Sequence, residues 1–128
     1  MKKIINTKKA PKPIGPYNQG IIINKTLYTA GQIPLLLNED KLSDGSLEEQ
    51  THLVMNHLHE ILKAGGMRFS DVVKSVLYLE NMDDFQQVNA IYAKYFDEGY
   101  APVRETVAVK KLPKGAKVEI SMIAVDSD

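Results

Sequence analysis

Two charged residues lie in stretches that otherwise have the pattern of β-strands, and they are the first candidates for chemistry. Arg104 opens one such stretch, and Glu119 lies between Val118 and Ile120 in the last one. A carboxylate in an apolar strand is seldom fully buried without a partner. Glu119 therefore has either a structural role, pointing into water or pairing with a lysine, or a chemical one. The chemistry open to the two residues is carboxylate binding by the arginine and proton transfer by the glutamate.

The other residue types that commonly carry catalysis do not form a recognisable site. The chain has no cysteine, which excludes a disulfide framework, a thiol nucleophile and a thiolate metal site. His52, His57 and His59 fall in one predicted helix, and no two of them have the i, i+4 spacing of paired metal ligands. We expect these histidines on a solvated helix face. No phosphate-binding loop, nucleophile elbow or zinc motif is present, so the sequence predicts neither a metal nor a cofactor.

Length and charge restrict the class of protein. The 128 residues fit a single domain spanning residues 1–128. With 16 basic and 16 acidic residues the net charge is zero, which argues against nucleic-acid binding by bulk electrostatics and leaves only a local patch for it. The basic N-terminus is not followed by the apolar segment of a signal peptide, and no stretch approaches the ~20 apolar residues of a membrane helix. We expect a cytoplasmic protein that does not bind membranes.

The first half of the chain has the pattern of a hairpin followed by a helix. Residues 21–23 and 26–30 are two short strands separated by a tight turn. Ser46 and Glu49 form a capping box at the start of a helix, and the Gly65-Gly66 pair ends it.

The second half predicts three strands and a second helix. Residues 72–79 are rich in β-branched and aromatic side chains and form a strand. Asp83 or Asp84 caps the second helix. Its apolar stripe, which we interpret as core, consists of Phe85, Val88, Tyr92, Tyr95 and Phe96. Residues 104–109 and 117–125 are the last two strands.

This order, with an additional N-terminal strand at residues 4–5, predicts a two-layer α+β domain in which two helices cover one face of a mixed sheet. The last strand is apolar on both faces: Val118, Ile120, Met122 and Ala124 on one, Ile123 and Val125 on the other. A bare sheet face of this kind would be a large exposed apolar patch. Another subunit is the simplest way to cover it.

Five short motifs stand in one order along the chain. They are Ile14-Gly15-Pro16-Tyr17, Gly31-Gln32-Ile33-Pro34, Asp84-Phe85-x-x-Val88-Asn89-x-x-Tyr92, Pro102-Val103-Arg104 and Val118-Glu119-Ile120. In order and spacing they resemble the RidA/YjgF family, and the resemblance covers almost the whole chain. The blocks around Arg104 and Glu119 are the most specific part of it.

The resemblance implies a chorismate-mutase-like fold, assembled as a homotrimer with three sites in the clefts between subunits. It also implies a deaminase that hydrolyses 2-iminopropanoate or 2-iminobutanoate to 2-keto acids and ammonia. These imines are unstable products of pyridoxal-phosphate-dependent dehydratases, which would be its functional partners. The residues that correspond to the family's site are Tyr17, Ala30, Gly31, Asn89, Arg104, Thr106 and Glu119.

Each role that the resemblance implies has a physical basis. Arg104 would bind the substrate carboxylate through two parallel hydrogen bonds. Glu119 would place the attacking water and move a proton, an effect typically worth ~10²–10⁴-fold. Tyr17 would close the pocket and make a hydrogen bond, and backbone groups near Gly31 and Thr106 would complete it. Arg104 and Thr106 are two residues apart, hence on one face of their strand.

Three positions depart from the family's common residues. Ala30 stands where a serine is frequent, Thr106 where a cysteine is frequent and Glu105 where a small residue is usual. Alternation should point Glu105 to the face opposite Arg104. These departures bear on substrate range and rate more than on the fold.

Two other functions remain open at this stage. The first is a trimeric binding module that captures 2-keto acids or serine without turnover, for which Arg104 alone would suffice. Glu119 discriminates against it, because an anion pocket has no need of a general acid or base. The second is an RNA-linked role, as a ribonuclease or translation inhibitor, or a chaperone-like one. Zero net charge and the lack of a catalytic histidine pair argue against RNA cleavage.

Overall fold

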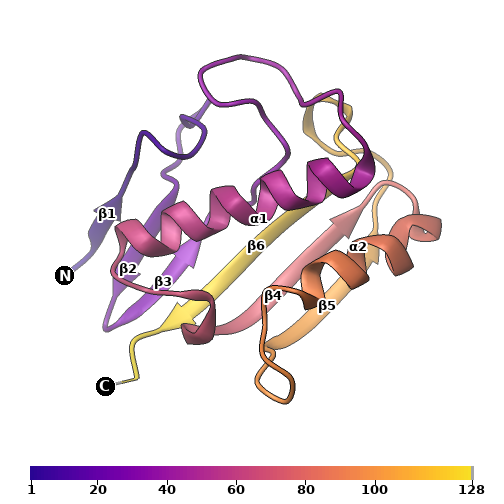
Figure 1. The fold of residues 1–128 in the computed structure, drawn as a ribbon. Coiled ribbons are helices and arrows are strands. Elements are labelled where there is room, and N and C mark those ends of the chain that lie inside the picture. Colours follow the sequence, from indigo (N-terminus) through magenta and orange to yellow (C-terminus); the bar gives the residue numbers. More distant parts are fainter. Residues whose placement is uncertain (128) are drawn as a thin grey trace.

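The N-terminal part of the chain builds one edge of the sheet. In the computed structural model, which describes residues 1–127, it contains β1 (Lys3–Ile5), β2 (Gly20–Ile23) and β3 (Thr26–Thr29) (Figure 1). The tight turn between β2 and β3 has positive φ at both central residues, 49° at Asn24 and 65° at Lys25, as a two-residue hairpin requires. The predicted hairpin and the additional N-terminal strand are both confirmed.

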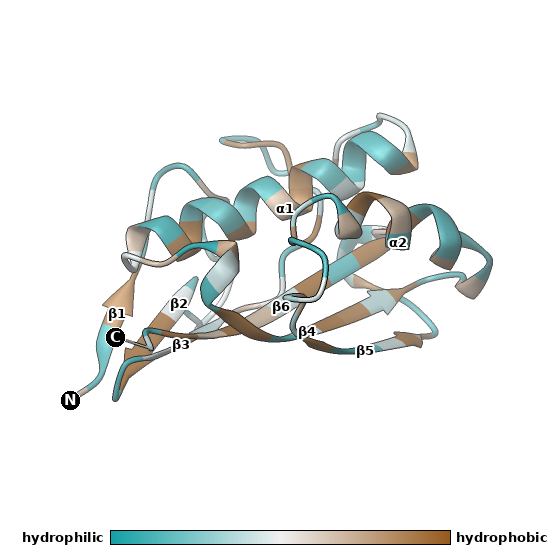
Figure 2. Ribbon diagram, turned by 60° about the horizontal axis from the view of Figure 1, so that its bottom comes forward, coloured by the Kyte–Doolittle hydropathy of each residue, from teal (hydrophilic) through white to brown (hydrophobic). Residues whose placement is uncertain are grey.

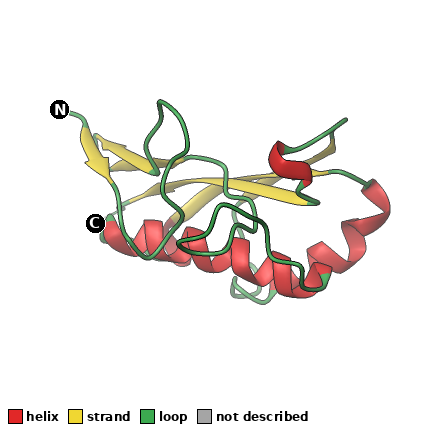
Figure 3. Ribbon diagram, turned by 90° about the horizontal axis from the view of Figure 1, so that it is seen from above, coloured by secondary structure: helices red, strands yellow, loops and turns green. Residues whose placement is uncertain are grey.

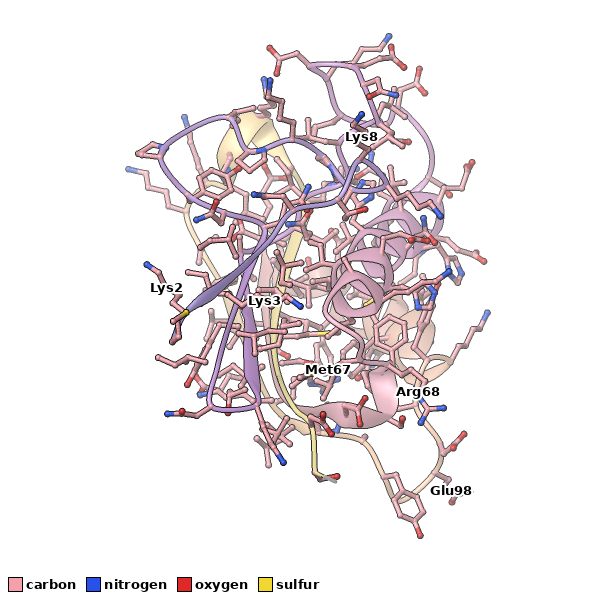
Figure 4. All side chains as sticks on the ribbon, turned by 90° about the vertical axis from the view of Figure 1, so that its left-hand side faces the viewer. Lys2, Lys3, Lys8, Met67, Arg68 and Glu98 are labelled. Carbon is pink, nitrogen blue, oxygen red and sulfur yellow. The ribbon has the colours of Figure 1, made fainter. Side chains whose placement is uncertain are left out.

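β1 is the outer strand on this side, and its open edge is short and charged. Lys2 and Lys3 lie at this edge, which faces the viewer in Figure 4. A three-residue edge strand flanked by lysines is a poor template for pairing with another chain.

The long helix α1 (Leu47–Ala64) begins and ends where its capping residues predict. Ser46 Oγ accepts a hydrogen bond from Glu49 N at 3.1 Å, and Glu49 Oε1 accepts one from Ser46 N at 3.1 Å. At the other end, the Gly65 N–H donates to carbonyls of the last turn. The inner face of the helix is fully buried against the sheet, including Val54 and Leu58.

A 3-10 turn precedes the second helix. It spans Met82–Asp84, follows β4 (Val72–Leu79) and leads directly into α2 (Phe85–Ala93). Asn81 caps this turn, since its Oδ1 accepts from Asp83 N at 2.9 Å. Asp84 holds the N-cap position of α2, as predicted, but it already has helical backbone angles and its side chain makes no capping hydrogen bond within the described residues. The predicted position of the cap is therefore confirmed, whereas the side-chain hydrogen bond of a capping aspartate is not found there.

The last two strands complete a six-stranded mixed sheet. β5 (Val103–Ala108) is followed by a 3-10 turn (Pro113–Gly115) and β6 (Val118–Val125), and the strand order is β1-β2-β3-β6-β4-β5. Only β4 and β5 pair in parallel, and α2 forms the crossover between them (Figure 1). A further short 3-10 turn, Phe69–Asp71, joins α1 to β4.

Both helices cover the same face of the sheet, as predicted (Figure 3). Along β6, residues alternate strictly between buried and half-buried, with Val118, Ile120, Met122 and Ala124 under the helices. Figure 2 shows that apolar residues run along the strands while the outer side of the helices is mainly polar.

The opposite side of the sheet, which we call the open face, is covered by neither α1 nor α2 (Figure 3). Ile123 and Val125 of β6 lie on it beside Tyr28 of β3 and Val76 and Tyr78 of β4. The predicted apolar character of both faces is thus confirmed. No helix within residues 1–127 is both long and apolar enough to cross a membrane.

Candidate active site

A hollow of about 320 Å³ lies where the loops after β1 and β3 meet the start of β6. It brings together four of the predicted site residues: Tyr17, Ala30, Gly31 and Glu119. The remaining lining residues are mostly apolar: Pro11, Ile14, Gln32, Ile33, Leu35 and Pro113. A small hollow with one carboxylate, one phenol and apolar walls suits a small organic ligand.

Glu119 is the one ionisable carboxylate in this hollow. It points to the open face of β6, opposite Tyr78 of β4, and is half-buried. Within residues 1–127 its carboxylate has neither an ion pair nor a hydrogen-bonded partner, so it is not the lysine-paired structural glutamate of the simpler interpretation. Burial without a partner raises the pKa of Glu119 above its ordinary value.

Gly31 allows the carboxylate to lie directly against the backbone. A methyl group placed on its Cα would come within 2.9 Å of Glu119 Cδ and would overlap the carboxylate oxygen. Gln32 fixes this approach, since it exchanges two backbone hydrogen bonds with Ile120, at 2.8 and 3.1 Å. The segment after β3 is thereby tied to β6 beside the glutamate.

Tyr17 lies in a turn that forms the other wall of the hollow. Its amide donates to Gly15 O at 2.8 Å, its hydroxyl accepts from Ile14 N at 3.4 Å, and its side chain is 46% exposed. The ring therefore stands at the mouth of the hollow with most of its hydroxyl's capacity unused.

Gln19, which the sequence interpretation did not single out, anchors the loop that carries this wall. Its side chain is buried, its Oε1 accepts from Thr7 N at 2.7 Å, and its Nε2 donates to the carbonyls of Thr7, Ala10 and Pro11. Four hydrogen bonds from one amide hold the irregular loop in place. The only signal in the sequence was its position two residues after Tyr17.

The other predicted residues form a second cluster under α2. Arg104 Nη1 donates to Asn89 Oδ1, and the guanidinium carbon lies 5.3 Å from the ring centroids of both Phe85 and Tyr92. Thr106 shares this face of β5, as predicted, and its buried Oγ1 has no hydrogen-bond partner.

Glu105 points the other way, also as predicted. On the open face it forms an ion pair with Lys74 of β4 at 2.8 Å. This pairing lowers the pKa of the Glu105 carboxyl and raises the pKa of Lys74. Lys74 thus neutralises the charge of Glu105 on the open face, opposite to the face on which Arg104 lies.

One chain does not bring the two clusters together. Glu119 lies on the open face, whereas Arg104 lies between β5 and α2 on the covered face. Their strands are two positions apart in the sheet, a lateral separation of roughly 10 Å.

The histidines do not lie on a solvated face, so that prediction was wrong. His57 is 1% exposed, and its Nε2 lies 2.8 Å from Leu35 O. His52 and His59 are half-buried because Tyr95 and Phe69 pack over this part of α1. Burial lowers the pKa of His57. In the part of the chain that the structure describes, no group of three or more histidine, aspartate or glutamate side chains could hold a metal ion.

The chain is similar to known proteins over nearly its whole length. The family described as Endoribonuclease L-PSP matches residues 7–126. The 2-iminobutanoate/2-iminopropanoate deaminase of Mus musculus is 42% identical over 125 residues, which are 98% of this chain and 92% of the mouse protein.

Solved structures show the same fold. A Thermotoga maritima protein superposes with a TM-score of 0.95 at 41% identity, with complete coverage of both chains. The structure of E. coli TdcF with bound serine gives a TM-score of 0.90 at 36% identity and covers 98% of this chain and 99% of TdcF.

The fold and the candidate site define a class of small α+β domains that have a hollow with a carboxylate at the start of the central strand. Within that class, the chain belongs to the RidA/YjgF/RutC family.

Proposed function

We propose that the protein is a deaminase that hydrolyses 2-imino acids, such as 2-iminobutanoate and 2-iminopropanoate, to 2-keto acids and ammonia. The observation that carries the proposal is the state of Glu119, a half-buried carboxylate without a partner and with a raised pKa, on the wall of a small hollow. The mouse relative, named for this activity, supports the choice of substrate.

Arg104 binds the carboxylate of the substrate in this proposal. Asn89 accepts only one of the five guanidinium N–H groups, and no acidic side chain among the described residues pairs with them. A carboxylate can therefore take two of the remaining donors, each hydrogen bond contributing about 1.5–3 kcal/mol.

Glu119 performs the proton transfers. Its carboxylate takes a proton from a water as the water oxygen bonds to the imine carbon and the C=N electron pair moves to nitrogen. The protonated carboxyl then returns this proton to nitrogen, which gives a carbinolamine. Glu119 next takes the proton of the carbinolamine hydroxyl and passes it to nitrogen, so that the C=O bond forms as the C–N bond breaks, and ammonia and the 2-keto acid leave. A raised pKa suits this cycle, because proton transfer is most efficient when the pKa of the group approaches the working pH. Tyr17 closes the hollow over the substrate.

The opposite placement of the two residues supports a site that two copies of the chain share. Glu119 and Arg104 lie on different faces of one sheet, so two subunits can supply them to one substrate more readily than one chain can. The apolar open face offers the surface for such an assembly. We infer a homotrimer with three sites between subunits.

A competition assay tests the activity. Threonine dehydratase generates the imine, semicarbazide traps it, and the protein is added in increasing amounts. We expect the yield of semicarbazone to fall and that of 2-oxobutanoate to rise with protein concentration. A semicarbazone yield that does not depend on the protein would refute the deaminase.

The second candidate is a binding module for small carboxylates, and the serine bound in TdcF favours it. The two functions separate in one preparation. A binding module binds 2-oxobutanoate without accelerating imine hydrolysis, whereas the deaminase does both.

A further inference from the structure

Three residues of α2 face Arg104 from one side of that helix. Phe85, Asn89 and Tyr92 occupy positions i, i+4 and i+7, which fall on one helix face. Asn89 accepts a hydrogen bond from the guanidinium, and the two rings lie at equal distances of 5.3 Å from its carbon. The cation is thus held by an amide and two aromatic faces.

Within residues 1–127, this mode of holding leaves four of the five guanidinium N–H donors without an acceptor. An aromatic face attracts a cation through its quadrupole and takes none of its N–H donors. A carboxylate in the same place would occupy two donors and compete with any anionic ligand. No carboxylate of the described chain pairs with Arg104, although Glu105 is its neighbour in sequence.

The two rings differ in what else they do. Tyr92 is 4% exposed and belongs to the main core, and the pKa of its hydroxyl is raised by burial. Phe85 is only partly buried and packs at the edge of that core. Phe85 can therefore be changed with less disturbance of the fold.

We propose that Phe85 and Tyr92 are positioning residues that fix the Arg104 guanidinium, so that its free edge is presented to the carboxylate of a 2-imino or 2-keto acid. The inference rests on the proposed role of Arg104 as the carboxylate anchor. It adds that the anchor is oriented by ring faces, which preserves all donors except the one taken by Asn89.

The test compares the affinity for 2-oxobutanoate, measured by calorimetry, in Phe85→Leu and in a matched control. Phe69→Leu is that control, because Phe69 is also a partly buried phenylalanine at the edge of the same core but contacts His59, Tyr95 and Phe96 instead of Arg104. We expect Phe85→Leu to weaken binding roughly 3- to 10-fold, Phe69→Leu to leave it unchanged, and Phe85→Tyr to restore it.

A second set of variants separates ring electrostatics from packing and serves even if Phe85→Leu does not fold. Phenylalanines with one, two or three ring fluorines at position 85 keep the shape of the side chain but progressively weaken the negative ring face. We expect affinity to fall with each added fluorine, and to be independent of fluorination in an Arg104→Ala background. A purely structural ring would show no such trend.

The outcomes distinguish this inference from the proposed function. If wild-type protein binds 2-oxobutanoate and the fluorinated proteins bind equally well, the positioning role is wrong and the carboxylate anchor stands. If wild-type protein does not bind 2-oxobutanoate, the anchor itself is wrong, and the positioning role is refuted with it.

Discussion

Glu119 and Arg104 lie on opposite faces of the same sheet, and their surroundings differ as much as their charges. Glu119 rests against the backbone at Gly31 without any partner for its carboxylate, so that burial raises its pKa. Arg104 is held by Asn89 and two aromatic rings. These contacts fix the position of Arg104, the group assigned to binding. In Glu119, the group assigned to proton transfer, burial changes the pKa instead.

The difference also separates the two parts of the proposed function. In that proposal, Arg104 under α2 binds the substrate carboxylate and Glu119 on the open face transfers protons. Binding would need only Arg104, whereas hydrolysis would need both residues at one substrate. Substitutions on the two faces therefore test binding and hydrolysis separately.

Glu119→Gln should have the largest effect. Glutamine keeps the shape but cannot take a proton, so turnover of the imine should fall by roughly 10²-fold or more while the affinity for 2-oxobutanoate is kept. Single-turnover assays and calorimetry on one preparation measure the two quantities. In the wild type, activity should decline as the pH falls through the raised pKa of Glu119. If hydrolysis survives in Glu119→Gln, the role of Glu119 is structural.

Mixing two inactive variants tests whether the residues act from different subunits. Arg104→Ala should lose binding and turnover, and Arg104→Lys should recover little, because an ammonium lacks the planar fork. When Glu119→Gln and Arg104→Ala chains are refolded together, about one quarter of the sites between subunits should contain both native residues. We therefore expect about a quarter of wild-type activity to return.

Sedimentation equilibrium supplies the control for this mixing experiment. The assembly should have a mass of about 43 kDa, three times the 14.3 kDa of one chain. Activity that does not return in a mixture of proven heterotrimers would place both residues of each site in one chain.

Gly31→Ala should have a smaller effect, which arises only from displacement of the Glu119 side chain. The added methyl group would displace the Glu119 carboxylate, and we expect turnover to fall roughly 10-fold with little change in 2-oxobutanoate affinity. Gly15→Ala is a suitable control, since a methyl group there would meet only the Tyr17 ring at an ordinary 3.7 Å. Equal losses in both variants would mean that the loops, and not the glutamate, are affected.

The smallest effect concerns stability and His57. Its pKa is lowered in the folded protein, so the unfolded chain binds the proton more readily, and stability should decrease as pH falls below about 6.5. The slope from this one group should not exceed about 1.4 kcal/mol per pH unit. Urea unfolding at pH 7.5 and 5.5 measures it, and His57→Gln should flatten the dependence. If the slope is the same in His57→Gln as in the wild type, other groups cause the pH dependence of stability.

The features that the sequence predicts well are those decided by neighbouring residues. The capping box at Ser46 and Glu49, the turn after β2 and the strand at residues 72–79 depend on local chemistry, and the structure has all three. The 3-10 turn before α2 was missed, because the side chain of Asn81 caps that turn and no aspartate side chain caps the helix in the described residues.

The residues of the candidate site were named from the sequence, but the placement of Arg104 and Glu119 on opposite faces of the sheet was not predicted. Alternation shows which residues share a face within one strand, yet it does not relate Arg104 on β5 to Glu119 on β6, because that depends on strand order. His57 is buried by a contact with Leu35, 22 residues away. The contact of Phe85 and Tyr92 with Arg104 likewise arises from the packing of α2 on β5.

The position of β6 has a consequence for how the chain is made. It is synthesised after the other five strands of the described chain, yet it lies in the middle of the sheet and pairs with both β3 and β4. The two strand groups cannot join in the sheet until β6 has left the ribosome. Until then both expose the edges that β6 will cover, so a stalled or truncated nascent chain would be a substrate for chaperones and proteases.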